Sequence, residues 1–287
     1  VVVLVGCFAV MKGDMTTGAL VACSILSSRM LAPISQVTGV LGRWQQAKVA
    51  KNGLDELMQK PVDRHERAQL IQRKVLLGDY DFKGVVFKYT EDDPRPTLVI
   101  PQLKIAVGEK VAILGRNGAG KSSLLQLLAG MQLPVQGKIS LDGVDQSLLD
   151  PDDIRRDMAL LNQNAHLFFG TIRENLTLGA PLATDEEIVR ALQITNALEI
   201  VEQKKEGLDH TILEGGVGFS GGQKQALLLT RLLLRNPNIV LLDEPTASID
   251  DVSEKVLIQH LKQWLGHRTL VVATHRPAVL QLVDRII

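Results

Sequence analysis

The chain has 287 residues, of which 45% are hydrophobic and 22% are charged, and its 32 basic side chains balance 32 acidic ones. That composition is typical of a folded protein rather than a disordered one. The sequence has no long basic tract, so nothing in it indicates a nucleic-acid partner. Cys7 and Cys23 both lie in apolar stretches, so we do not expect a disulfide scaffold.

The chain begins at Val1 within one apolar run and stops at Ile287 within another, so we interpret it as part of a longer protein. Residues 1–11 are uncharged but too short to cross a bilayer, and Lys12–Asp14 interrupt them. A signal peptide is not expected, because no basic segment precedes this run.

Met15–Gly42 is long enough to span a membrane. The basic residues that follow it indicate the cytoplasmic side: Arg43, Lys48 and Lys51. We therefore expect residues 1–43 to contain the end of one span, an outer turn and a last span. A buried helical hairpin of a soluble protein is the alternative, because several polar side chains dilute the apolar signal. Arg29, the one charge within Met15–Gly42, either lines a substrate path or has a structural role.

Residues 44–78 are charged, and they predict a cytoplasmic helix that stops near Pro61 and then a linker. From Asp79 onward the pattern predicts an α/β domain with a β-rich edge and a helical insertion, over residues 79–287. The expected strands are Phe82–Tyr89, Leu103–Val107, Val111–Leu114, Lys138–Leu141, Ile239–Leu242 and Leu270–Ala273. The expected helices are Asp185–Gln203 and Gln223–Leu234.

A phosphate-binding loop follows one of these strands. Gly115-Arg116-Asn117-Gly118-Ala119-Gly120-Lys121-Ser122 fits the pattern G-x-x-x-x-G-K-[ST], between a strand at 110–114 and a helix at 122–129. Its backbone amides would converge on phosphate oxygens, Lys121 would reach the β- and γ-phosphates, and Ser122 would hold Mg²⁺. We expect ATP to contact Gly115, Asn117, Gly118, Gly120, Lys121, Ser122 and Ser123. A glycine-rich turn with a purely structural role is the alternative.

Two carboxylates end the apolar strand at 239–242. Asp243 could hold Mg²⁺, directly or through water, and Glu244 could orient or deprotonate the attacking water. His275 follows the strand at 269–274, at the edge where such sheets bind ligands.

The segment Phe219-Ser220-Gly221-Gly222-Gln223-Lys224-Gln225 closely resembles the L-S-G-G-Q signature of ABC ATPases, with Phe in place of Leu. With the preceding motifs, it makes residues 79–287 similar to the nucleotide-binding domain of the ABC exporter family, a P-loop NTPase fold. The resemblance implies an ATPase that uses ATP and Mg²⁺. It also implies that Ser220, Gly221, Gly222 and Gln223 complete the site of a second copy in a dimer.

The resemblance further implies roles for individual residues. Tyr89 would stack on adenine, Gln163 would contact Mg²⁺ and water, and His275 would contact the γ-phosphate. Asp250 would anchor the loop at 247–250 that crosses to the partner copy, and Glu214 would meet the membrane domain. No core catalytic position is substituted, which argues against a non-hydrolysing nucleotide-binding regulator.

Residues 29–34, 45–47 and 168–176 resemble the exporters of bacterial type I secretion, which export RTX toxins and adhesins. That resemblance implies a multi-pass protein of the bacterial inner membrane with a cytoplasmic ATPase domain. Its partners would be a periplasmic adaptor, an outer-membrane channel and an exported protein. An exporter of lipids, peptides or drugs is the alternative. A soluble ABC ATPase of translation or DNA repair would lack the apolar segment at 15–42.

Overall fold

We describe residues 2–60, 70–90 and 92–287 from a computed structural model, in which the chain divides into two units, Val1–His65 and Glu66–Ile287. Residues 61–69, which include the predicted helix stop near Pro61, lie outside the described residues. Each unit is considered by itself.

The first unit is a helical hairpin of α1 (Val2–Met11) and α2 (Thr17–Met58), joined by a turn at Lys12–Asp14. The side chain of Thr16 caps α2 by accepting a hydrogen bond from the amide of Ala19 (3.2 Å). By length and composition, α2 is able to cross a membrane, whereas α1 is a shorter apolar helix. Because α2 continues through residue 43, the division between a span and a cytoplasmic extension stays a prediction.

The core of the second unit is a five-stranded parallel sheet. Its strand order is β11 (Arg285–Ile286), β3 (Lys110–Ile113), β10 (Thr269–Ala273), β9 (Ile239–Asp243) and β6 (Met158–Leu161). Alternate residues enter two different cores, with Val271 in one and Val272 in the other. The sheet is therefore covered on both faces, as the apolar runs at 111–114, 239–242 and 270–273 predict.

An antiparallel sheet forms the predicted β-rich edge, in the order β2 (Leu98–Ile105), β1 (Tyr80–Phe87), β4 (Gln136–Leu141) and β5 (Val144–Asp145). The predicted strand Leu103–Val107 was too short, because β2 starts at Leu98 and contains Pro101. Proline cannot donate to a sheet and usually ends a strand, but the edge position of β2 tolerates it. Strand β1 lies two residues earlier than predicted, with a register shift between Lys83 and Val86.

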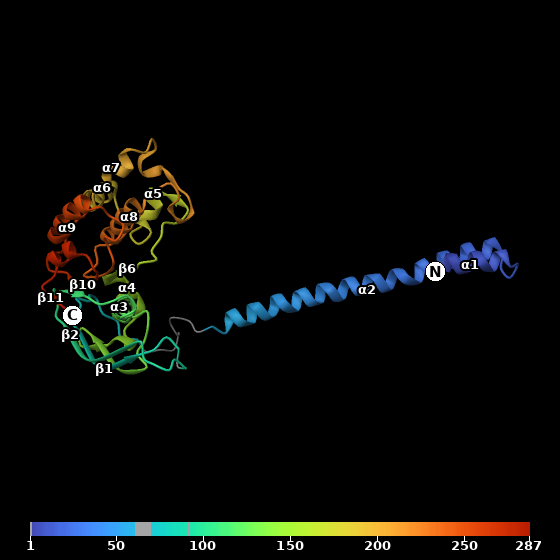
Figure 1. Cartoon of the computed structure of the whole chain (residues 1–287), viewed down its shortest axis with the longest axis horizontal. Helices are drawn as coiled ribbons and strands as arrows, with labels where there is room; N and C mark the ends of the chain where they lie inside the picture. Colours follow the sequence, from blue (N-terminus) through green and yellow to red (C-terminus); the bar gives the residue numbers. More distant parts are fainter. Residues whose placement is uncertain (1, 61–69, 91) are drawn as a thin grey trace. The chain divides into compact units, whose positions relative to one another are not determined.

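The helices α5 to α8 gather at one end of this unit, and β1 and β2 lie at the other (Figure 1). The α-helices are α3 (Lys121–Leu128), α4 (Pro151–Asp157), α5 (Ile172–Thr177), α6 (Asp185–Ile194), α7 (Leu198–Glu202), α8 (Gly221–Leu234) and α9 (Asp251–Leu265). Short elements complete it: β7 (Gly170–Thr171), β8 (Thr211–Ile212), η1 (Gln146–Leu148), η2 (Gly207–Asp209), η3 (Glu214–Gly216) and η4 (Pro277–Leu282). The predicted helical segment Asp185–Gln203 forms two helices, α6 and α7, because Asn196 adopts a left-handed φ of 57° between them.

Residues before Asp79, where we expected the domain to start, already form hydrogen bonds with the rest of the second unit. Asp157 accepts a hydrogen bond from the amide of Leu76 (2.8 Å), and Asp142 accepts one from the amide of Leu77 (2.6 Å). Thr269 donates to the carbonyl of Leu77 (2.7 Å). These bonds satisfy an extended backbone that has no sheet partner of its own.

Candidate nucleotide site

The predicted phosphate loop connects β3 to α3. Gly118 and Gly120 adopt left-handed φ values of 81° and 88°, which favour glycine. A Cβ atom on Gly120 would lie 2.5 Å from Cδ2 of Leu98, so the side chain of Leu98 would have to move. The ammonium of Lys121 donates to the carbonyls of Gly115 (2.9 Å) and Arg116 (3.3 Å), and so draws the loop around the start of α3.

The first turn of α3 fits an anionic ligand. Its N-cap residue is Gly120, which offers no side chain to accept hydrogen bonds from the first-turn amides. Those amides and the positive end of the helix dipole face the same loop. The cradle is therefore suited to phosphate oxygens, as the sequence predicts for Lys121 and Ser122.

Tyr89 lies beside this loop. Its hydroxyl is 2.8 Å from Oγ of Ser123 and donates to Oε1 of Gln126 (3.3 Å), two residues of α3. Its ring packs edge-on against Phe87, with centroids 4.9 Å apart, and the residue is 53% exposed. A base could therefore stack on the ring without displacing the protein core.

The two predicted carboxylates end β9, and the histidine follows β10, its neighbour in the sheet. Oε1 of Glu244 is 2.9 Å from Nδ1 of His275, whose side chain is 70% exposed. Oε2 of Glu244 is buried and has no hydrogen-bond partner among the described residues. Asp243 is buried at the end of the same strand. An orphaned buried carboxylate oxygen beside the phosphate loop is suited to hold a water molecule.

Gln163 is exposed and follows β6, the other neighbour of β9. Leu161 pairs with Leu242 in the parallel register, so Gln163 emerges at the same edge as Glu244. The structure thus brings the phosphate loop, Asp243, Glu244, Gln163 and His275 to one edge of the sheet. Glu214 is exposed in η3, which does not directly follow any of these strands.

The predicted signature begins α8. Oγ of Ser220 accepts a hydrogen bond from the amide of Gln223 (3.2 Å), and Oε1 of Gln223 accepts one from the amide of Ser220 (2.9 Å). This reciprocal pair is a capping box. Asp250 caps α9 through the amides of Val252 and Ser253, and the backbone hydrogen bond from Ser253 lowers its pKa.

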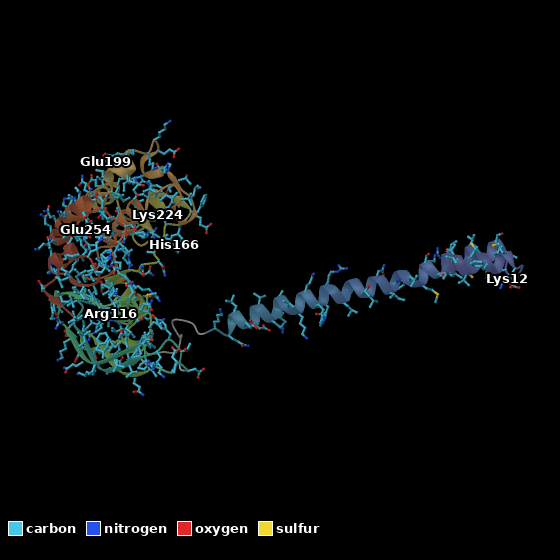
Figure 2. All side chains as sticks on the ribbon, in the orientation of Figure 1. Lys12, Arg116, His166, Glu199, Lys224 and Glu254 are labelled. Carbon is cyan, nitrogen blue, oxygen red and sulfur yellow. The ribbon has the colours of Figure 1, made fainter. Side chains whose placement is uncertain are left out.

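The signature contacts the loop at 247–250 rather than the phosphate loop. A Cβ atom on Gly222 would lie 2.8 Å from the carbonyl oxygen of Ser248. A pocket of about 350 Å³ lies between the signature, this loop and the C-terminal end of α6 with α7, and phosphate-loop residues are absent from its described lining. Figure 2 likewise shows Arg116 of the phosphate loop apart from Lys224 of α8. Among the described residues, the signature and the phosphate loop therefore lie at separate places in one copy.

Two residues that were not predicted from the sequence contact the candidate site. Gln225 donates from Nε2 to the carbonyl of Glu244 (2.9 Å) and so links α8 to the residue that follows β9. Arg276, directly after His275, donates to the buried carboxylate of Glu254 (3.0 Å) and to the carbonyl of Ile249 (3.0 Å). Each partner is 19 or more residues away in the sequence, so no local motif marked them.

Comparison with known proteins gives three findings. A sequence model of the ABC transporter family matches residues 100–247. The leukotoxin translocation ATP-binding protein LktB is 32% identical over 282 residues in both Mannheimia glucosida and Mannheimia haemolytica. Each match covers 98% of this chain but 39% of the relative, so the chain spans about two fifths of their length.

Among solved structures, a bacterial Atm1-family ABC exporter with ATP bound matches with a TM-score of 0.78 and 27% sequence identity. That match covers 95% of this chain and 48% of the exporter. It extends over both described units, the apolar hairpin as well as the α/β unit.

Proposed function

The chain belongs to the ABC transporter family, and from that premise we propose that it hydrolyses MgATP to drive export across a membrane. The observation that carries this proposal is the Glu244–His275 pair. Oε2 of Glu244 is buried, has no hydrogen-bond partner among the described residues and lies at the sheet edge where the phosphate loop begins. The apolar helix α2, in the same chain, supports a transport role over that of a soluble ATPase.

The donors at this edge suit Mg²⁺. The ion prefers oxygen ligands, commonly one or two carboxylates together with substrate phosphates and water. Asp243, Ser122 and Gln163 would supply such oxygens. When bound, the ion neutralises charge on the phosphates.

We propose the following roles for the site residues in hydrolysis. Lys121 and the first-turn amides of α3 hold the phosphates. Oε2 of Glu244 orients the water that attacks the γ-phosphorus and takes up its proton as the bond to the β-phosphate oxygen breaks. His275 keeps one ring nitrogen on Glu244 and leaves Nε2 for the γ-phosphate. Tyr89 stacks on the adenine.

A dimer would complete the site. The signature and the phosphate loop are separate in one copy, so ATP would be held by the phosphate loop of one copy and by Ser220–Gln223 of the other. Backbone amides and the Ser220 hydroxyl would then surround the γ-phosphate where charge develops. Binding would close the pair, and hydrolysis would release it.

For the cargo, we propose a protein exported by type I secretion from the bacterial inner membrane. The similarity to LktB, a leukotoxin translocation protein, supports this choice. An adaptor and an outer-membrane channel would then be partners. An exporter of lipids, peptides or drugs is the second candidate; the match to an Atm1-family exporter supports export but names no cargo.

Hydrolysis of MgATP by the purified full-length protein tests the proposed activity. Lys121→Ala should lose nucleotide binding, because the substitution removes the cation that would meet the β- and γ-phosphates. Lys262→Ala removes the same charge from an exposed position on α9 and should bind normally. Equal MgATP affinity in the two variants would contradict the assignment of the phosphate loop.

A further inference from the structure

Arg276 joins two loops that follow different strands of the parallel sheet. Its guanidinium donates to Oε2 of Glu254 (3.0 Å), to Oδ1 of Asp251 (3.2 Å) and to the carbonyl of Ile249 (3.0 Å). Its own amide donates to Oγ1 of Thr274 (3.0 Å). The side chain is 23% exposed and that of Glu254 is 5% exposed, so the central ion pair is largely shielded from water.

The two loops belong to different parts of the machinery. On one side, Arg276 directly follows His275, which is bonded to Glu244. On the other side, Ile249 belongs to the loop at 247–250, and Ser248 of that loop packs against the glycines of the signature. Glu254 and Asp251 lie in the first turn of α9, which starts where this loop ends.

We infer that Arg276 is a positioning residue through which the two nucleotide sites of a dimer sense one another. This inference rests on the proposed function, in which Glu244 and His275 serve one ATP and Ser220–Gln223 of the same copy serve the other. A shift of His275 on hydrolysis would then displace the loop at 247–250, and with it the signature on the neighbouring site.

The contacts explain why this residue must be an arginine. The planar guanidinium reaches a carbonyl and two carboxylates at once, which an ammonium does with poorer geometry. Removing it leaves the buried carboxylate of Glu254 without its partner, and Oε1 of Glu254 already has none among the described residues. The loop at 247–250 would then lose its link to His275 while the phosphate loop stays intact.

Steady-state hydrolysis of MgATP by full-length variants tests this role through kcat, KM and the Hill coefficient. Arg276→Ala should lower kcat about tenfold through misplacement of the loop. It should reduce cooperativity toward a Hill coefficient of about 1, because the sites no longer communicate. KM should change by less than about twofold, since Arg276 does not touch ATP. Arg276→Lys should restore part of both losses.

Glu254→Gln keeps the shape of the side chain and provides a second variant if Arg276→Ala folds poorly. It should reproduce the loss of cooperativity, and the double variant should be no worse than either single one. Arg285→Ala is the control, because that arginine pairs with Glu109 at the far edge strand of the sheet (2.7 Å).

Wild-type kcat and cooperativity in Arg276→Ala would overturn the positioning role, and so would additive effects in the double variant. Those outcomes would leave the ATPase proposal standing. Absence of hydrolysis in the unaltered protein would instead overturn both.

Discussion

The backbone of Glu244 adopts a left-handed φ of 49°, which is uncommon for a residue other than glycine. Two hydrogen bonds hold it there: its amide donates to the carbonyl of Ala273 (2.9 Å), and its carbonyl accepts from Gln225 (2.9 Å). Strain of this kind costs on the order of 1–3 kcal/mol and persists where the surroundings fix the geometry. In this conformation Oε1 lies 2.9 Å from Nδ1 of His275, and Oε2 has no hydrogen-bond partner among the described residues.

At the same scale, two substitutions of Tyr89 distinguish the contribution of ring stacking from that of the hydroxyl hydrogen bonds. Tyr89→Ala should weaken MgATP binding by about 1 kcal/mol, or about fivefold in Kd, through loss of the aromatic contact. Tyr89→Phe should bind nearly normally, because it loses only the hydroxyl contacts with Ser123 and Gln126. Calorimetric titration measures both. Equal affinity in Tyr89→Ala and the unaltered protein would exclude the stacking role.

At the scale of elements, α9 depends on its capping carboxylate. Hydrogen bonds from the amides of Ser253 and Val252 lower the pKa of Asp250 below its ordinary value of 3.8. A depressed folded-state pKa means that the cap stabilises the fold above pH 3.8 and is lost as pH falls through the folded value.

Asp250→Ala should therefore lower the melting temperature at neutral pH, with a difference that shrinks below pH 3.8. Asp250→Asn is the matched variant, since its amide oxygen still accepts the same hydrogen bonds but does not titrate in this range. A melting-temperature difference independent of pH in Asp250→Ala would show that the charged cap is not the cause.

A substitution of Gly222 tests the packing of α8 against the loop at 247–250. An added Cβ would lie 2.8 Å from the carbonyl oxygen of Ser248, too close for ordinary contact, so the first turn of α8 or the loop at 247–250 must move. Gly222→Ala should lose at least about tenfold in ATPase activity with little change in MgATP affinity, because it alters only the partner-facing half-site. Gly53→Ala in α2 is the control, because no atom of the described residues, apart from the neighbouring helix backbone, lies within 4 Å of a Cβ placed there. Retained ATPase activity would contradict the role of this turn.

At the scale of the whole molecule, the features that could be predicted from the sequence are those determined by neighbouring residues along the chain. The phosphate loop, the strand that ends at Asp243 and the capped turn at Ser220 are continuous segments whose geometry follows from their own residues. The family match confirms the ABC ATPase fold. The kinked segment around Asn196 was missed because its helical pattern continues on both sides of one left-handed residue.

Contacts between distant segments could not be predicted from one sequence. The pair Arg276–Glu254 and the bond from Leu76 to Asp157 join residues that are 22 and 81 positions apart. The hydrophobic periodicity of the sequence does not predict such pairs, because they depend on how the strands are ordered in the sheet. The number of spans and the cargo stay proposals, since the chain covers 39% of its LktB relatives.

ATP-driven pairing of the two half-sites is the central claim, and cross-linking between copies measures it most directly. Cysteines replace Arg116 and Lys224 in a full-length Glu244→Gln protein whose Cys7 and Cys23 are serine. Glu244→Gln should bind MgATP without turnover, so MgATP should strongly raise the yield of cross-links between copies. A cross-linking yield that MgATP does not change would contradict a site shared between the phosphate loop and the partner's signature.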